Sequence, residues 1–301
     1  MGFLERGVVH MFGPNLGKDF ERRLPIASSR ADAEGDCRER HSIAAAAQST
    51  VSSSLLWKPR AARGVDMKED ADCRGKARSM NQCEFCQELQ GLPGNRFGAM
   101  YAGIAASRIV AQTEHFVVLP TIGQLCAGSL LILPRVHKET CAELQRTQQE
   151  GLAAILKRVT TTIRQFGWPV FFEHGAKCHT GGSCGIYHAH LHVVPLPALV
   201  EPRELFPEHV KAATSIQDAL EALKDSEHYL LIGSEDGVVF ASVDSLPSAP
   251  VSQHFRRRLR DRFSLSKHWD WRETAGPESE LLATVSAFGG EHVSDWAGNS
   301  A

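Results

Sequence analysis

The sequence predicts a protein of the α+β class, in which an antiparallel sheet packs against one long helix. Short apolar segments bounded by glycine, proline or polar residues recur between residues 108 and 194, which is typical of strands. Apolar side chains recur at helical spacing across residues 139–166, and Gly167 follows as a stop signal. Residues 1–79 show neither period. We therefore expect a folded part that begins near residue 80.

Five strands are predicted before residue 200, and each has a short apolar core. They cover residues 108–111, 115–120, 129–134, 169–173 and 186–194, the last ended by Pro195 and Pro197. Beyond Val200, we expect helices near 208–224 and 252–263 and strands near 229–232 and 238–241. This C-terminal part is predicted to be an accessory α/β segment that packs on the first unit.

The N-terminal segment has the composition of a disordered leader. It carries scattered charges and a low-complexity stretch from Ser42 to Ser54, and it cannot bury enough apolar surface to offset its ordering entropy. Met80 stands directly before the organised sequence, so one hypothesis is that translation starts there. We predict three parts: a leader at 1–79, a folded domain at 80–200 and the accessory segment at 201–301.

Composition and charge narrow the class of function. The net charge of −2 gives no overall attraction for nucleic acid, so no specific nucleic-acid partner is expected. No apolar run approaches the 18 residues of a membrane span, and the N-terminus lacks a secretory core. Eight cysteines in 301 residues are too sparse for a disulfide scaffold. We expect a cytoplasmic protein without a membrane partner.

The most informative segment is Ile186-Tyr-His-Ala-His-Leu-His-Val-Val194. Side chains alternate between the faces of a strand, so His188, His190 and His192 are predicted to share one face. The apolar residues between them would face a core. His188 and His192 would lie roughly 13 Å apart, because alternate residues advance about 6.6 Å. One zinc ion binds nitrogen at about 2.1 Å and cannot span that gap. At least one imidazole is therefore left for other chemistry.

A glycine-rich turn, Gly181-Gly-Ser-Cys-Gly185, precedes the histidines. Glycines allow backbone N–H groups to approach a phosphate closely. Alone such a turn is a weak signal, but beside three alternating histidines it favours a phosphate site. The alternative is a half-exposed strand that carries histidines by chance.

The His188-Ala-His-Leu-His-Val-Val194 segment resembles the signature of the histidine triad family. Cys83-Glu-Phe-Cys86 and Leu131-Ile-Leu-Pro-Arg-Val-His137 also look like family landmarks, and the likeness covers about residues 80–197. In this family the middle histidine attacks the α-phosphorus of a nucleotide and forms a covalent nucleotidyl-histidine. The resemblance therefore implies a nucleophile at His190, a phosphate contact at His192 and a phosphate-facing turn that contains Ser183 and Gly185. A protonated His192 would stabilise charge on the phosphoryl oxygens.

The chain departs from the family at the ribose pocket. Many members have an aspartate at the position that Thr121 takes here, and a histidine at the position of Ser129. Cys184 and Gly185 fall where a serine or asparagine is common. Thr121 and Ser129 are predicted to contact substrate, but the choice of substrate is left open.

A zinc site is implied by a second resemblance, to the galactose-1-phosphate uridylyltransferases and their relatives. Two cysteines, a histidine after the central strand and the first triad histidine are the zinc ligands there. Cys83, Cys86, His137 and His188 match them. A closed four-ligand site would be structural. The alternatives are a metal-free cysteine pair, a redox pair, or a rival site made of Cys178, His179, Glu173 and His174.

The basic stretch from Ser252 to Phe263 is predicted to be an amphipathic helix. Phe255, Leu259 and Phe263 would pack on a core. Arg256 and Arg257 would either lie on a solvated face or hold a polyphosphate. With Trp269-Asp-Trp-Arg272, this stretch resembles the C-terminal extension of some bacterial histidine triad proteins.

These observations predict a nucleotide hydrolase or nucleotidyltransferase that acts on a phosphoanhydride, phosphoramidate or phosphoester of a nucleotide. Structural zinc is the expected metal, and attack by His190 needs no catalytic cofactor. A homodimer is expected by resemblance alone. Two alternatives stay open: a nucleotide sensor without turnover, and a zinc-dependent hydrolase with two triad histidines as ligands.

Overall fold

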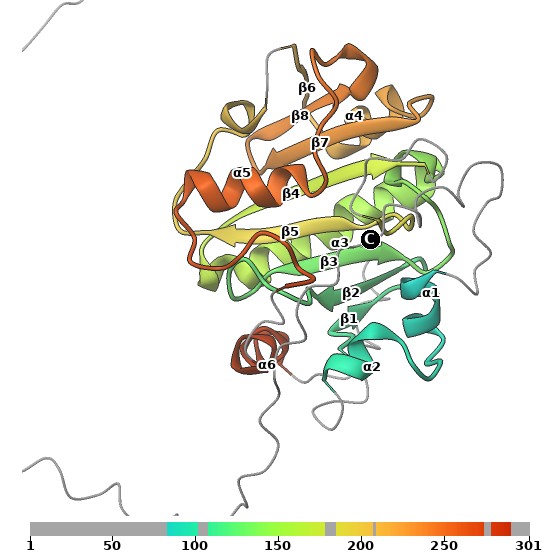
Figure 1. The fold of residues 1–301 in the computed structure, drawn as a ribbon. Helices are drawn as coiled ribbons and strands as arrows, with labels where there is room; N and C mark the ends of the chain where they lie inside the picture. Colours follow the sequence, from blue (N-terminus) through green and yellow to red (C-terminus); the bar gives the residue numbers. More distant parts are fainter. Residues whose placement is uncertain (1–82, 102–107, 178–184, 207–208, 274–277, 290–301) are drawn as a thin grey trace, which may run out of the picture. The chain divides into compact units, whose positions relative to one another are not determined.

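The computed structural model describes residues 83–101, 108–177, 185–206, 209–273 and 278–289 (Figure 1). The predicted leader at 1–79, the start at Met80, and Ser183 lie outside the described residues. Among the helices described, none has the length and apolar character that a membrane span requires.

The predicted antiparallel sheet is confirmed, and it is larger than predicted. Its eight strands run in the order β1-β2-β3-β5-β4-β7-β8-β6. All neighbouring strands pair antiparallel. Their bounds are β1 Ala111–Gln112, β2 Phe116–Pro120, β3 Leu130–Pro134, β4 Trp168–Ala176, β5 Leu191–Leu196, β6 Lys211–Ala213, β7 His228–Ser234 and β8 Gly237–Ser242.

Helices cover both faces of the sheet (Figure 1). On one face, α3 (Arg146–Ile163) and α4 (Ile216–Ala222) contribute to the largest apolar core. On the other face, α1 (Glu84–Leu89) packs on β2 and β3, while α5 (His254–Arg262) packs on β4, β5 and β7. The remaining helices are α2 (Arg96–Met100) and α6 (Glu278–Ser286), with 3₁₀ turns at Cys141–Glu143, Arg164–Phe166, Pro202–Leu205 and Val243–Ser245.

The long helix begins later than predicted. It starts at Arg146 rather than near residue 139, because Gln145 and Gln148 form a capping box there. Upstream, two backbone N–H groups bond to side chains from the sheet instead of continuing a helix. Cys141 N–H donates to the Glu173 carboxylate and Ala142 N–H donates to the Tyr229 hydroxyl. Distant partners therefore override the helical pattern.

The histidine segment is only partly a strand. β5 begins at Leu191, so residues 186–190 lie before the sheet, contrary to the prediction. The preceding Ala189 N–H donates to the Lys138 carbonyl at 2.6 Å rather than to a strand partner. The strand also continues through Pro195, which lies opposite Pro169 on β4. The predicted alternation is nevertheless confirmed: Ala189, Leu191 and Val193 belong to the core on the α3 face.

The C-terminal part contributes strands to the same sheet. β7 and β8 confirm the predicted strands, and β7 pairs directly with β4. The helix predicted near 208–224 is shorter, because residues 211–213 form β6 and pair with β8. Ser215 then caps α4 by accepting a hydrogen bond from Asp218 N–H at 3.1 Å.

Candidate functional site

A cavity lies over β5 on the sheet face that α1 and α5 cover. His190, just before β5, and His192, within β5, both line it. The other described residues that line it are Glu84, Phe85, Glu88, Arg96, Arg108, Thr121, Ile122, Leu131, Phe172, His174, Ile186, Gln253, His254, Phe255, Arg256 and Trp271.

The orientation of His190 is set by the backbone beside it. Its Nδ1 lies 2.6 Å from the carbonyl oxygen of His188. A carbonyl can only accept, so Nδ1 carries the proton and Nε2 keeps its lone pair. The ring packs edge-on to Phe85 at 5.6 Å and to His192 at 5.2 Å. In this tautomer Nε2 is the unprotonated nitrogen, which is the ring nitrogen that can act as a nucleophile.

His192 has a different environment. Its ring stacks on Phe172, with centroids 4.6 Å apart and planes 11° apart. Its Nδ1 is buried and has no hydrogen-bond partner among the described residues. Burial first, and then the positive charges of His190 and Arg256, hold the pKa of His192 well below its ordinary value. This direction favours the neutral imidazole, so the condition under which His192 would stabilise phosphoryl charge as a cation is not favoured here.

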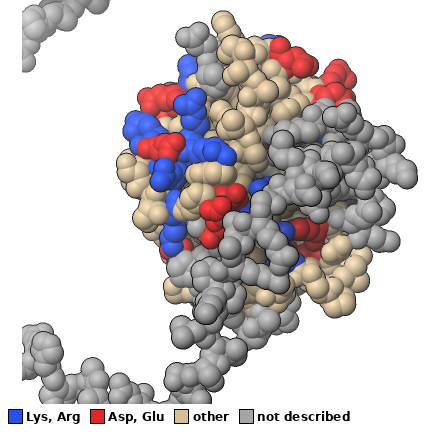
Figure 2. All heavy atoms as spheres, in the orientation of Figure 1, with Lys and Arg blue, Asp and Glu red and all other residues tan. Residues whose placement is uncertain are grey.

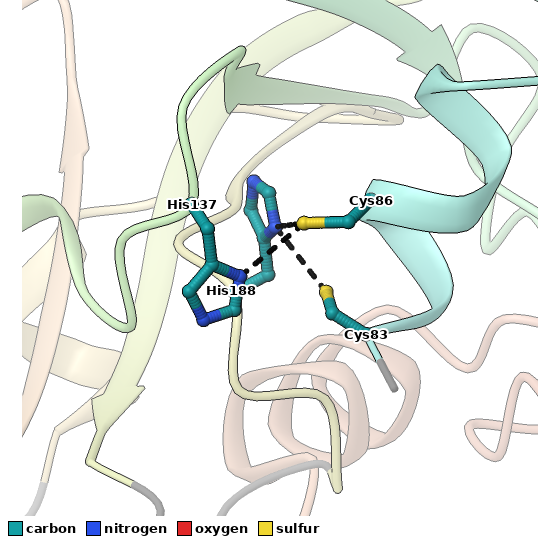
Figure 3. A group of neighbouring side chains, drawn as sticks. All are labelled: Cys83, Cys86, His137 and His188. Atoms are coloured by element: carbon teal, nitrogen blue, oxygen red, sulfur yellow. Dashed lines mark hydrogen bonds between the residues drawn. The ribbon is translucent and has the colours of Figure 1, made fainter. Parts of the chain in front are cut away.

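Four side chains form a compact group that could hold a metal ion, here called the metal-binding group: Cys83, Cys86, His137 and His188 (Figure 3). Their potential ligand atoms all lie within 4.8 Å of one another. His188 Nδ1 lies 3.4 Å from Cys83 Sγ and 3.5 Å from Cys86 Sγ, and His137 Nδ1 lies 3.4 Å from Cys86 Sγ. A tetrahedral zinc with bonds of about 2.3 Å to sulfur and 2.0–2.1 Å to nitrogen has sulfur–nitrogen edges of about 3.6 Å. These residues therefore fit a zinc ion.

The tautomer of His188 also suits a metal ligand. Its Nε2 lies 3.0 Å from the Pro134 carbonyl oxygen and donates to it, which leaves the Nδ1 lone pair directed at the two sulfurs. Burial by itself raises the pKa of Cys83. Hydrogen bonds with His137 and His188 outweigh burial and bring the pKa down to about 5. Burial and then the charge of Cys83 raise the pKa of Cys86 to about 12. A divalent cation would offset this repulsion and bind both thiolates.

The remaining predicted substrate residues lie in different places. Thr121 lines the cavity, but its hydroxyl donates to the Ser129 carbonyl at 3.1 Å. Ser129 is fully buried, and its hydroxyl donates to the Cys126 carbonyl at 2.6 Å, away from the described lining. Gly185 has φ of +84°, and a Cβ there would lie 3.3 Å from Arg272 Nη2. This contact brings the C-terminal part against the end of the glycine-rich turn.

The rival metal set is not assembled among the described residues. Glu173 is buried and accepts hydrogen bonds from Cys141 N–H and the Tyr229 hydroxyl. His174 Nε2 lies 2.7 Å from His228 Nε2. The other two members of that set, at positions 178 and 179, lie outside the described residues.

Arg256 and Arg257 have structural contacts. Buried Arg256 donates from Nε to the Trp269 carbonyl and from Nη2 to the Gly123 carbonyl, both at 2.7 Å. Arg257 lies over the Trp269 ring at 3.3 Å. Phe255 and Leu259 pack in the core, as predicted. Figure 2 shows basic side chains, with acidic ones among them, over the region of α5. Arg258, Arg260 and Arg262 of this helix are exposed.

Several residues of the cavity wall were not predicted from the sequence. Arg108 forms a two-point ion pair with Glu88, at 2.7 and 2.8 Å, and so ties α1 to the segment before β1. Arg96 lies 4.6 Å from the Trp271 ring centroid, joining α2 to the C-terminal part. His254 also faces the cavity. No short motif marks these positions, because only the packing of α1, α2 and α5 over the sheet brings them together.

The fold and the site define a class of protein. Alternating histidines lead into a central strand of an antiparallel sheet, and a long helix packs on the opposite face. The chain therefore has the motif and the α+β fold expected of the histidine triad proteins.

The comparisons with known proteins name particular relatives within that class. No protein-family model matches the chain. The galactose-1-phosphate uridylyltransferase of Haemophilus influenzae is 30% identical over 91 residues, which are 29% of this chain and 26% of that protein. The chain thus spans about a quarter of the length of this curated relative.

Two solved structures are also similar. A Zn-bound histidine triad family protein from Mycobacterium smegmatis is 24% identical with a TM-score of 0.26, over 33% of this chain and 72% of that one. The yeast Ap4A phosphorylase in complex with Ap4A is 11% identical with a TM-score of 0.32, over 50% of this chain and 69% of that one.

Proposed function

We propose that this protein is a nucleotide hydrolase or nucleotidyltransferase in which His190 attacks the α-phosphorus of a nucleotide derivative. The observation that carries the proposal is the 2.6 Å hydrogen bond from His190 Nδ1 to the His188 carbonyl. It holds the proton on Nδ1 and leaves the Nε2 lone pair for a cavity that His190 lines. The motif resemblance and the relatives support the same chemistry.

The reaction has two steps, formation of a nucleotidyl-histidine and its breakdown. His190 Nε2 forms a bond to phosphorus while the bond from phosphorus to the leaving group breaks, and the leaving group departs with that electron pair. Water or another acceptor then attacks the nucleotidyl-histidine, losing its proton as the N–P bond breaks and the imidazole is restored. The His188 carbonyl stabilises the cationic ring during the first step, because it accepts a hydrogen bond from Nδ1–H throughout.

We also propose a structural zinc ion at Cys83, Cys86, His137 and His188. The fit of the sulfur–nitrogen distances supports zinc, and four ligands complete a tetrahedron without an open position. Zinc would then tie α1 to the segment that carries His190. This ligand set argues against a zinc-dependent hydrolase built from two triad histidines, because His188 would be used by the closed site.

The test is to trap the covalent intermediate. Dinucleoside polyphosphates, phosphoramidates, aminoacyl-adenylates and sugar nucleotides, each labelled in the nucleotide, are mixed with the protein and quenched at alkaline pH. We expect the label on His190 by peptide mapping, and its loss in His190→Ala. His115→Ala is the matched control, because His115 lies on the connection before β2 and not in the described cavity lining.

Labelling elsewhere, or turnover that survives His190→Ala, would contradict the proposal. Nucleotide binding without label or turnover across the panel would instead favour the sensor. The predicted homodimer, the cytoplasmic location and the boundary near residue 200 stay predictions.

A further inference from the structure

The peptide unit between His188 and Ala189 is hydrogen-bonded at both ends. Its carbonyl oxygen accepts from His190 Nδ1 at 2.6 Å, and its N–H, which belongs to Ala189, donates to the Lys138 carbonyl at 2.6 Å. Both distances are short for N–H···O bonds. A peptide group that donates at one end becomes a better acceptor at the other, because each bond polarises the group. A distant part of the chain therefore strengthens the acceptor that holds the His190 proton.

The next peptide unit along this path ends on a carboxylate. Lys138 shares that unit with Glu139, whose N–H donates to Glu143 Oε2 at 3.2 Å. The Glu143 carboxylate thus connects to the His190 ring through two peptide units and three hydrogen bonds, here called the peptide path. Every N–H along the path points toward Glu143. Aligned peptide dipoles add, so a negative charge at one end favours a positive charge at the other.

Residues of the sheet hold the turn that carries Glu143. Glu143 is the last residue of a 3₁₀ turn. Within this turn, Cys141 N–H donates to the Glu173 carboxylate at 3.0 Å, and Ala142 N–H donates to the Tyr229 hydroxyl at 3.1 Å. Glu173 and Tyr229 are both buried, and the hydroxyl donates to the carboxylate. The turn is therefore fixed by bonds other than those of the Glu143 side chain.

The metal-binding group joins the same two segments of the chain. His137 directly precedes Lys138, and His188 directly precedes Ala189. Both histidines belong to the metal-binding group, next to the hydrogen bond that links Lys138 to Ala189. The middle of the peptide path is thus held from a second side. The charge of Glu143 can therefore be removed without displacing the two peptide units.

The proposed reaction places a positive charge on His190. A ring that keeps its Nδ1 proton becomes a cation when its Nε2 bonds to phosphorus. Only 8% of His190 is exposed, and a buried charge is costly unless it is compensated. Acidic residues of the described lining are already paired with arginines. Glu84 pairs with Arg96 at 3.1 Å, and Glu88 pairs with Arg108 at 2.7 Å. The peptide path supplies a carboxylate by another route.

We propose that Glu143 is a positioning residue that stabilises the cationic form of His190 through the peptide path. This inference rests on the proposed function, since the ring gains its charge when Nε2 bonds to phosphorus. The carboxylate polarises both peptide units, so the His188 carbonyl accepts more strongly from Nδ1–H as that charge develops. Glu143 thereby speeds formation of the nucleotidyl-histidine without contacting the nucleotide.

The first test separates the charge of Glu143 from its hydrogen bond to the turn. Glu143→Gln keeps an oxygen that accepts from Glu139 N–H but removes the negative charge. The measured quantity is the single-turnover rate constant for transfer of labelled nucleotide to His190, with a dinucleoside tetraphosphate and a nucleoside 5′-phosphoramidate as donors. We expect this rate constant to fall about 3- to 10-fold, while the half-saturating donor concentration stays unchanged.

Glu150→Gln is the matched control. It removes the same charge from an exposed position on α3, where Glu150 pairs with Arg146 at 3.3 Å, and it should leave the rate constant unchanged. Urea unfolding of Glu143→Gln should match that of the wild type, because the hydrogen bond to Glu139 is kept. A wild-type rate constant in Glu143→Gln, or an equal loss in Glu150→Gln, would overturn the proposal.

The second test needs no turnover. Proton NMR follows the Ala189 amide proton and the His190 Nδ1 proton, the latter assigned by its loss in His190→Ala. A proton in a shorter, more polar hydrogen bond resonates further downfield. We therefore expect both resonances to move upfield in Glu143→Gln and to stay in place in Glu150→Gln. Unmoved resonances in Glu143→Gln would overturn the role of the path. Absence of label on His190 with every donor of the panel would instead overturn the proposed function, and the two resonances would still test the path.

Discussion

At the scale of single residues, backbone carbonyls decide what each histidine of the site can do. His188 Nε2 donates to Pro134, and His190 Nδ1 donates to His188. The unprotonated nitrogen is therefore Nδ1 in the first ring and Nε2 in the second. One histidine thereby becomes suited to a metal and its neighbour to phosphorus. Two histidines that are two residues apart thus have different unprotonated nitrogens, because each ring donates to one backbone carbonyl.

The metal site makes a prediction at this scale. Cys86→Ser is expected to reduce bound zinc from about one per chain to near zero, because a hydroxyl is a poor substitute for a thiolate. A site held at 100 to 1,000 times its Kd contributes about 3–4 kcal/mol to stability, so the free energy of unfolding should fall by about that amount. Elemental analysis and urea unfolding measure the two effects.

Cys126→Ser is the matched control for this experiment. Cys126 is partly buried, whereas Cys86 is buried. Cys126 does not belong to the metal-binding group. The Cys126→Ser variant should keep its zinc. Wild-type protein that is purified without chelator and contains no zinc, yet unfolds at the same urea concentration after zinc is added, would refute the site.

At the scale of elements, close packing of a glycine in the turn before β3 helps to position the strands beside the cavity. Gly128 precedes β3 with φ of +89°, and a Cβ there would lie 2.7 Å from the Phe166 ring and 3.0 Å from Pro195. The turn before β3 therefore packs on the 3₁₀ turn that follows α3 and on β5 at once. Its position helps to set the register in which β3 places Leu131 opposite His192.

Gly128 and Gly94 have nearly the same φ, so the stabilities of their alanine variants can be compared. Gly128→Ala has both an unfavourable φ and a steric clash, whereas Gly94 has φ of +84° and nothing within 4 Å of an added Cβ. We expect a cost of roughly 1–2 kcal/mol for Gly94→Ala from the backbone alone. Gly128→Ala should cost a further 1–3 kcal/mol or so from overpacking. Equal urea midpoints for the two variants would show that the turn relaxes.

At the scale of the whole molecule, the continuous sheet couples the N-terminal and C-terminal parts. β7 pairs with β4 over six residue pairs, from Phe171–Gly233 to Ala176–His228. α5 returns to cover β4 and β5, and its Phe255 packs on Phe172 at 5.3 Å. The C-terminal part therefore supplies the strand that extends the sheet beyond β4, and α5 supplies one wall of the cavity.

This coupling predicts a single unfolding transition. Hydrogen exchange of β2–β3 and of β7–β8, measured by mass spectrometry across a urea series, should give the same midpoint because the two hairpins belong to one core and one sheet. Loss of protection in β7–β8 while β2–β3 stay protected would mean that the C-terminal part is an independent accessory unit.

Much of the fold could be predicted from local patterns. The strands around Leu131, Val170 and Leu231 were found because apolar runs between breakers depend only on nearby residues. The start of the long helix and of β5 could not be found, because Glu173, Tyr229 and Lys138 take backbone groups that a local pattern assigns to helix or strand. The same holds for His254, whose place in the cavity depends on where α5 packs.

By itself the sequence determined the alternation that sends His190 and His192 to one face and Leu191 to the other, because side-chain direction in extended backbone has a period of two. Only the tertiary structure decided which nitrogen of each ring is available and which wall each ring faces. Those properties depend on single acceptors such as Pro134, 54 residues from His188. Hydrogen bonds over such separations form only when the chain has folded, so no local pattern encodes them.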